Sequence, residues 1–195
     1  MNIILTGMRG TGKTALGERL AASLKIQFVD LDKMIAERME MSIADLVQEQ
    51  GWEAFRQAEQ QVVEEVSHYK NYVISTGAGA LMNEENFKLL KKTGKIVLLT
   101  TSLEILAERL EADGNRPALM PGKTLAEELE LAWQERQERY YAIADLIYES
   151  DLQTEDKESD LTQKVEELKN LLKENKFIGS VFLSLRTIWR ICGVN

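Results

Sequence analysis

Short runs of apolar residues alternate with longer amphipathic segments along this chain. The runs are bounded by glycine or polar residues, as is typical of strands buried on both faces of a parallel sheet. Five of them occur, at residues 3–5, 27–29, 72–74, 96–99 and 146–148, the second and the last being the weakest. Between them, apolar residues recur at helical spacing in segments 14–24, 52–66 and 103–110. The alternation predicts a three-layer α/β fold, in which a five-stranded parallel sheet is flanked by helices.

The stretch over residues 113–123 interrupts this alternation. It holds both prolines of the chain, Pro117 and Pro121, together with Gly114 and Gly122. Proline and glycine are poorly tolerated inside helices, so we expect a mobile loop between two helices. A loop of this kind can act as a lid over a site.

The end of the chain adds two further segments. Residues 161–172 predict a charged helix packed at the edge of the sheet, and residues 176–195 predict an amphipathic helix with one broad apolar face. That face can dock on the protein's own core or on a second copy, or it can bind a membrane surface with the help of Arg186 and Arg190. We favour docking, and we divide the chain into a folded domain over residues 1–175 and a C-terminal extension over 176–195.

Composition and charge narrow the classes of protein that fit. A chain of 195 residues that is 44% apolar can bury one core, so we expect a single enzymatic domain and a monomer. The formal net charge of −8 argues against binding to nucleic acid, which requires an excess of cations. The only cysteine, Cys192, excludes an internal disulfide. The first apolar run is too short for a signal peptide or a membrane span, so we expect a cytoplasmic protein.

The strongest chemical signal directly follows the first predicted strand. Residues 7–14 read GMRGTGKT, which fits the P-loop motif G-x-x-x-x-G-K-[ST] and opens the first predicted helix. The glycines let backbone N–H groups turn inward around phosphate at the positive end of that helix. We expect Lys13 to reach the β- and γ-phosphates of ATP and the Thr14 hydroxyl to bind Mg²⁺. The predicted ATP-binding residues of this segment are Gly10, Thr11, Gly12, Lys13, Thr14 and Ala15.

The motif defines a P-loop NTPase fold but does not distinguish a kinase from a GTPase or an ATPase. Further motifs lie downstream. Asp30 and Asp32 end the second predicted strand, where both can face the crevice above the sheet, although a turn or a helix cap is an alternative. The other motifs are FRQAE at 55–59, STGAG at 75–79, NRP at 115–117 and ERQERY at 135–140. In order and spacing over about residues 1–170, this series resembles shikimate kinase.

The resemblance implies a fold like that of the nucleoside monophosphate kinases, with a lid and a substrate-binding helical segment after the second strand. For the nucleotide side it implies that Asp30 holds Mg²⁺ through water. It also implies that Arg116, in the lid, neutralises charge on the transferring phosphoryl group, and that Arg109 stacks on adenine. Lys13, Asp32 and Arg116 would then be the catalytic residues.

For the acceptor side, the resemblance implies that Asp32 hydrogen-bonds the hydroxyls of shikimate and acts as general base. Arg56 and Arg136 would hold the carboxylate, a task that suits the planar guanidinium group. The substrate-binding residues implied are Asp32, Arg56, Gly77, Ala78, Gly79 and Arg136. The implied reaction transfers the γ-phosphate of ATP to the 3-hydroxyl of shikimate, with Mg²⁺ as cofactor, as a step of aromatic amino-acid biosynthesis.

Ala78 departs from the Gly-Gly-Gly loop of that family. If the central residue needs a positive φ, alanine adds a strain of about 1–2 kcal/mol; if it does not, its N–H group donates as glycine would. Two alternatives therefore stay open. One is a P-loop kinase for another small acid or sugar such as gluconate, or for a nucleoside monophosphate. The other is a catalytically silent protein that binds nucleotide without turnover.

Overall fold

The structure is a computed structural model that describes residues 1–113, 123–151 and 157–178. The strands are β1 (Asn2–Thr6), β2 (Gln27–Asp30), β3 (Tyr72–Ser75), β4 (Gly94–Thr100) and β5 (Leu146–Glu149). The helices are α1 (Lys13–Leu24), α2 (Leu31–Met39), α3 (Ile43–Val66), the short 3₁₀ helix η1 (Ala80–Met82), α4 (Glu84–Lys91), α5 (Leu103–Asp113), α6 (Leu125–Ile143) and α7 (Lys157–Glu174). Each strand is followed by at least one helix, as the pattern predicts.

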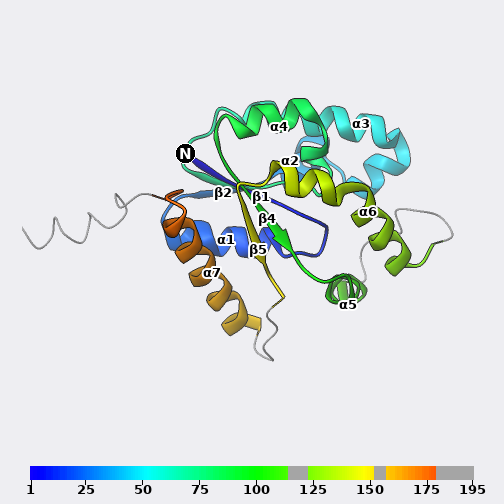
Figure 1. Ribbon diagram of the computed structural model, residues 1–195. Helices are drawn as coiled ribbons and strands as arrows, with labels where there is room; N and C mark the ends of the chain where they lie inside the picture. The colour runs from blue at the N-terminus through cyan, green and yellow to red at the C-terminus, as the bar shows by residue number, and fades with distance from the viewer. Residues whose placement is uncertain (114–122, 152–156, 179–195) are drawn as a thin grey trace, which may run out of the picture.

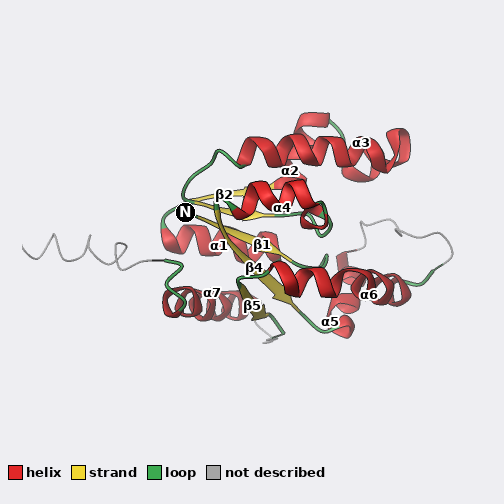
Figure 2. Cartoon of the chain, turned by 45° about the horizontal axis from the view of Figure 1, so that its top comes forward, coloured by secondary structure: helices red, strands yellow, loops and turns green. Residues whose placement is uncertain are grey.

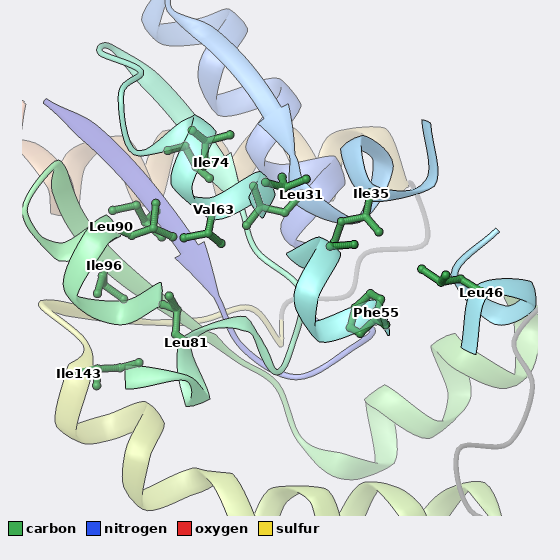
Figure 3. Close-up of a cluster of buried hydrophobic side chains, with 14 residues drawn as sticks. Leu31, Ile35, Leu46, Phe55, Val63, Ile74, Leu81, Leu90, Ile96 and Ile143 are labelled. Carbon is green, nitrogen blue, oxygen red and sulfur yellow. The ribbon is translucent and has the colours of Figure 1, made fainter. Parts of the chain in front are cut away.

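The strands form one parallel sheet in the order β2-β3-β1-β4-β5, which lies between two layers of helices (Figures 1 and 2). The two faces are built by alternate residues of β1. Ile3 and Leu5 pack with α1 and α7, whereas Ile4 packs with α2, α3 and α4. Figure 3 shows other members of the cluster around Ile4, among them Leu31 of α2, Val63 of α3 and Leu90 of α4. The three β1 side chains are at most 1% exposed, so the apolar runs without alternation do correspond to strands covered on both faces.

The strand order places three sequence motifs next to one another. From β1 the chain passes to β2 and β3 on one side and then crosses to β4 and β5 on the other, so the reversal falls beside β1. In an open parallel sheet, ligands bind outside the carboxyl ends of the strands at such a reversal. The segments that leave the carboxyl ends of β1, β2 and β3 are the P-loop, the Asp30–Asp32 pair and the Gly77–Gly79 loop.

The sequence located all five strands to within two residues at each end. It was less complete for the helices. The segment 52–66 is only the second part of α3, which begins at Ile43 and leaves the helical backbone conformation at Gly51 (φ 83°, ψ 170°). The pattern did not locate α2, although the resemblance implied a helical segment after the second strand.

The charged helix predicted over 161–172 corresponds to α7. It covers the sheet face beside α1 through Val165, Leu168 and Leu172, and Glu167 accepts a hydrogen bond from Tyr148 on the edge strand β5. The helix therefore lies on a face near the edge rather than against the edge itself. Phe177 and Ile178 also pack on this cluster, whereas residues 179–195 and residues 114–122, where the sequence predicts a lid, lie outside the described residues. In the part of the chain that is described, no helix is both long and apolar enough to cross a bilayer.

Asn2 fixes the start of β1 and therefore the position of the P-loop. Its buried amide donates to the Tyr69 carbonyl at 2.8 Å and accepts from the Tyr72 N–H at 3.1 Å. Asn2→Ala leaves both backbone groups without this partner, and we expect the free energy of unfolding in urea to fall by about 1–3 kcal/mol. The matched control is Asn175→Ala, which removes an exposed amide at the end of α7 and should cost less than about 0.5 kcal/mol. Equal effects of the two substitutions would contradict this role of Asn2.

Candidate active site

The P-loop turns around an open centre at the start of α1. Gly7, Gly10 and Gly12 have φ values of 139°, 83° and 87°, a conformation that side chains with a Cβ rarely adopt. The Lys13 ammonium donates to the carbonyl oxygens of Gly7 and Met8 at 3.0 and 2.8 Å. Its positive charge therefore lies over the loop, at the end of the helix where backbone N–H groups also favour an anion.

An ion pair connects this loop to α6. The Arg9 guanidinium lies 3.0 Å from Glu128 in the first turn of α6, and the two side chains are only 14% and 3% exposed. The limited exposure means that solvent screens this pair less than a surface ion pair. The nucleotide-binding loop is thus attached to the helix that carries Arg136.

Thr14 and Asp30 bring two oxygen atoms that can bind a metal ion close together beside the P-loop. The Thr14 hydroxyl donates to Asp30 Oδ2 at 2.6 Å, and Asp30 Oδ1 accepts from the backbone N–H groups of Asp32 and Lys33 at the start of α2. The helix-cap reading of Asp30 is therefore correct, and it leaves the second carboxylate oxygen directed at Thr14. A hydroxyl and a carboxylate next to a phosphate cradle are hard oxygen ligands that fit Mg²⁺.

Arg109 connects α5 to the same loop. Its guanidinium donates to the Gly10 carbonyl at 3.3 Å and to the Ser150 carbonyl at 3.2 Å. Its expected stacking on adenine stays a prediction. Arg116, the lid arginine, lies outside the described residues.

A cavity of about 310 Å³ opens beside Gly79, in the segment that follows β3. Its lining residues come from α3, α6 and the segment after β3, and they are Arg56, Gly79, Met82, Asn83, Glu135 and Arg136. The two arginines that the sequence singled out thus face one space, although they are 80 residues apart in the chain. Sequence reasoning missed Met82, Asn83 and Glu135 as lining residues, and their only signal was adjacency to the Gly77–Gly79 loop and to Arg136.

A buried carboxylate holds Arg56 in this cavity. Glu59, one turn later on α3 and 1% exposed, lies with its Oε2 2.7 Å from Arg56 Nη1. Burial raises the pKa of Glu59, the charge of nearby Asp32 adds to this rise, and the charges of Arg56 and Arg136 oppose it. Among the described residues, Glu59 Oε1 has no hydrogen-bond partner, so one carboxylate oxygen beside Arg56 can still accept a hydrogen bond. The sequence signal was the F-R-x-x-E motif, whose two charged ends share one helix face.

The Gly77–Gly79 loop fits between these charged groups only because its outer residues lack side chains. A Cβ on Gly77 would lie 2.7 Å from Asp32 Oδ1, and a Cβ on Gly79 would lie 2.7 Å from Arg56 Nη2. The φ of Ala78 is not positive, so alanine meets no backbone strain there. This finding answers the question that the sequence raised about the centre of the loop.

A phosphate cradle with a lysine, an acidic pair and a second pocket with two arginines share one edge of the sheet. A parallel sheet of this strand order with a P-loop after its first strand defines a P-loop nucleotide-binding protein, and the neighbouring cavity with two arginines fits a second, acidic ligand. The sequence model of the shikimate kinase family matches residues 9–170, which is most of the chain. The chain belongs to the shikimate kinase family.

Similarity to individual relatives extends over most of each sequence. The chain is 37% identical to a shikimate kinase of Pelotomaculum thermopropionicum over 177 residues, which are 91% of this chain and 98% of that protein. It is also 37% identical to shikimate kinase 2 of Photorhabdus laumondii over 155 residues, covering 78% of this chain and 88% of the relative. Among solved structures, shikimate kinase from Acinetobacter baumannii in complex with shikimate superposes with a TM-score of 0.79, at 29% identity, over 91% of this chain and 95% of that one.

The raised pKa of Glu59 makes stability depend on pH. A buried carboxyl whose folded pKa lies above its ordinary value of 4.5 stabilises the fold while it is protonated, and this contribution is lost as the pH rises through the folded pKa. Glutamine is neutral at every pH. The free energy of unfolding of Glu59→Gln, relative to the unchanged protein, should therefore rise with pH above about 4.5 and level off beyond the folded pKa.

Urea unfolding between pH 4 and 8 measures this difference. Glu53→Gln removes an exposed carboxylate from the same helix and controls for the change in net charge. A relative stability of Glu59→Gln that is constant over this range, or that falls with pH, would show that Glu59 is not protonated more readily in the folded state.

Proposed function

We propose that this protein transfers the γ-phosphate of ATP to the 3-hydroxyl of shikimate. The observation that carries the proposal is the convergence of Arg56 and Arg136 on one cavity, beside Asp32 and the Gly77–Gly79 loop, in a member of the shikimate kinase family. A small polyol acid needs such a pocket, because its carboxylate must be neutralised while its hydroxyls are oriented.

In this proposal, the two arginines bind the carboxylate of shikimate. Arg56 is oriented by Glu59, because its Nη1 donates a hydrogen bond to Glu59 Oε2. The same side chain lines the cavity, so its other N–H groups can bind a ligand there. A guanidinium presents several N–H donors in a plane, which suits bidentate binding of a carboxylate. Binding the carboxylate at this end places the ring hydroxyls toward Asp32 and the P-loop.

Asp32 then orients the 3-hydroxyl and accepts its proton. The hydroxyl oxygen forms the new bond to the γ-phosphorus, the bond from that phosphorus to the β,γ-bridging oxygen breaks, and ADP leaves. Lys13 and the P-loop N–H groups hold the phosphates in line, and Arg116 is assigned to the charge that develops on the transferring group. Arg109 contacts the P-loop carbonyl of Gly10, which supports a position next to the nucleotide.

Thr14 and Asp30 are the residues that would hold Mg²⁺, the first through its hydroxyl and the second through water. The two oxygens lie 2.6 Å apart, and Thr14 directly follows the P-loop lysine at the start of α1, which supports this assignment. When bound with ATP, the ion neutralises phosphate charge and orients the β- and γ-phosphates.

We further propose that the enzyme acts as a monomer in the cytoplasm. The P-loop and the cavity that holds Arg56 and Arg136 are both formed by described residues of one chain, which supports a site that does not need a second copy.

Steady-state kinetics with a panel of acceptors tests the proposed function. Purified protein with ATP and Mg²⁺ should release ADP only when shikimate is added, and shikimate should give a kcat/KM at least about 100-fold above gluconate or a nucleoside monophosphate. Arg136→Lys should raise the KM for shikimate by about tenfold or more, because lysine does not reproduce the bidentate contact. Turnover with another acid but not with shikimate would refute the acceptor assignment and leave a kinase of different specificity.

Two substitutions in the Gly77–Gly79 loop test two effects separately, namely backbone strain at Ala78 and the close approach of Gly77 to Asp32. Since Ala78 already has a permitted φ, Ala78→Gly should change kcat/KM for shikimate by less than about threefold. Gly77→Ala inserts a methyl group 2.7 Å from Asp32 Oδ1, so it should displace the carboxylate and lower kcat/KM by more than about tenfold. A large gain of activity in Ala78→Gly would instead favour a protein whose natural loop impairs turnover.

A further inference from the structure

Tyr140 joins α6 to the acceptor loop, and neither the sequence motifs nor the proposed reaction gives it a role. It is fully buried, and its hydroxyl donates a hydrogen bond to the Ala78 carbonyl at the centre of the loop. Burial raises the pKa of this hydroxyl to about 12, so it remains a protonated donor at neutral pH. Arg136 lies one helical turn earlier on α6, and its nearby charge offsets part of this rise in the pKa.

The bond to Ala78 determines which way the next peptide N–H points. A trans peptide is planar, and its carbonyl and N–H point in opposite directions. The chain has no cis peptide bond among the described residues, so the Ala78 carbonyl that faces Tyr140 turns the Gly79 N–H away from Tyr140. Gly79 lines the cavity, and within the described ranges no backbone carbonyl accepts a hydrogen bond from its N–H. Among the described residues this N–H has no hydrogen-bond partner, so it is available to an acceptor in the cavity that Gly79 lines.

The ring of Tyr140 has a separate, structural task. It packs in a cluster with Leu98 and Leu129, and it stacks on Trp133 with ring centroids 6.3 Å apart. Phenylalanine would preserve this packing and remove only the hydroxyl. The role of the hydroxyl can therefore be tested without opening a cavity in the core.

We propose that Tyr140 is a positioning residue for the acceptor, which fixes the peptide between Ala78 and Gly79 and thereby presents the Gly79 N–H to the pocket. The inference rests on the proposed function, because it names shikimate as the acceptor whose binding is affected. It assigns no contact between Tyr140 and either substrate.

Steady-state kinetics of Tyr140→Phe tests this role. We expect the KM for shikimate to rise by about tenfold, the effect of losing one well-placed buried hydrogen bond, while the KM for ATP changes by less than about twofold. Tyr141→Phe is the matched control, since Tyr141 is the next residue and its ring is 47% exposed; its kinetics should equal those of the unchanged protein. A purely structural tyrosine would lower the melting temperature without this split between the two KM values.

A donor-retaining replacement completes the test. Tyr140→4-aminophenylalanine keeps the ring size and a neutral N–H donor, so it should restore the KM for shikimate to within about threefold of the original. Unchanged KM values in Tyr140→Phe, or failure of the amine to restore them, would overturn the inference while the proposed function stands.

Amide hydrogen exchange distinguishes a failure of the proposed function from a failure of the positioning role of Tyr140. If the unchanged protein does not phosphorylate shikimate, the proposed function fails, but faster exchange at residues 77–79 in Tyr140→Phe than in Tyr141→Phe would still support the positioning of the loop. Equal exchange in the two variants would refute it.

Discussion

The proposed acceptor half of the site depends on one buried group, the carboxyl of Glu59. Its ionised form is unfavourable in the interior, and Arg56 in direct contact and Arg136 nearby offset only part of this cost, so the pKa of Glu59 stays above its ordinary value. Because Glu59 binds Arg56, the guanidinium lies close to the loop, and the residue that passes it is Gly79, which has no side chain. The position of the pocket, its positive lining and its glycine loop all follow from this arrangement.

The nucleotide half is built from different elements and is brought alongside by the sheet. The P-loop follows β1, the Thr14–Asp30 pair connects α1 to the end of β2, and the acceptor loop follows β3. The carboxyl ends of parallel strands lie at the same edge of the sheet. Three loops that are far apart in the sequence therefore lie close together there. The family membership of the chain and the geometry of its two pockets therefore agree on a phosphoryl transfer between neighbouring sites.

Much of this could be predicted from the sequence, and the reasons for the rest are physical. Runs of buried residues identified the strands because parallel strands are apolar on both faces, and the P-loop was evident because its spacing is local. The convergence of Arg56 and Arg136 on one cavity and the bond from Tyr140 to Ala78 depend on how α3, α6 and the loop after β3 pack, which a linear pattern does not contain. The consequence of Ala78 could only be stated conditionally, since its φ is set by the surrounding loop.

Helix α6 contacts both halves of the site. Glu128 binds the P-loop arginine Arg9. Two to three turns later, Arg136 lines the cavity beside Gly79, and Tyr140 donates a hydrogen bond to Ala78 in the Gly77–Gly79 loop. A helix rises 1.5 Å per residue, so Glu128 and Tyr140 are held about 18 Å apart along its axis. Adding or deleting a single residue between them would rotate one end by about 100° against the other. In this family member, the length of α6 is therefore under a stricter constraint than the identity of its outward-facing side chains.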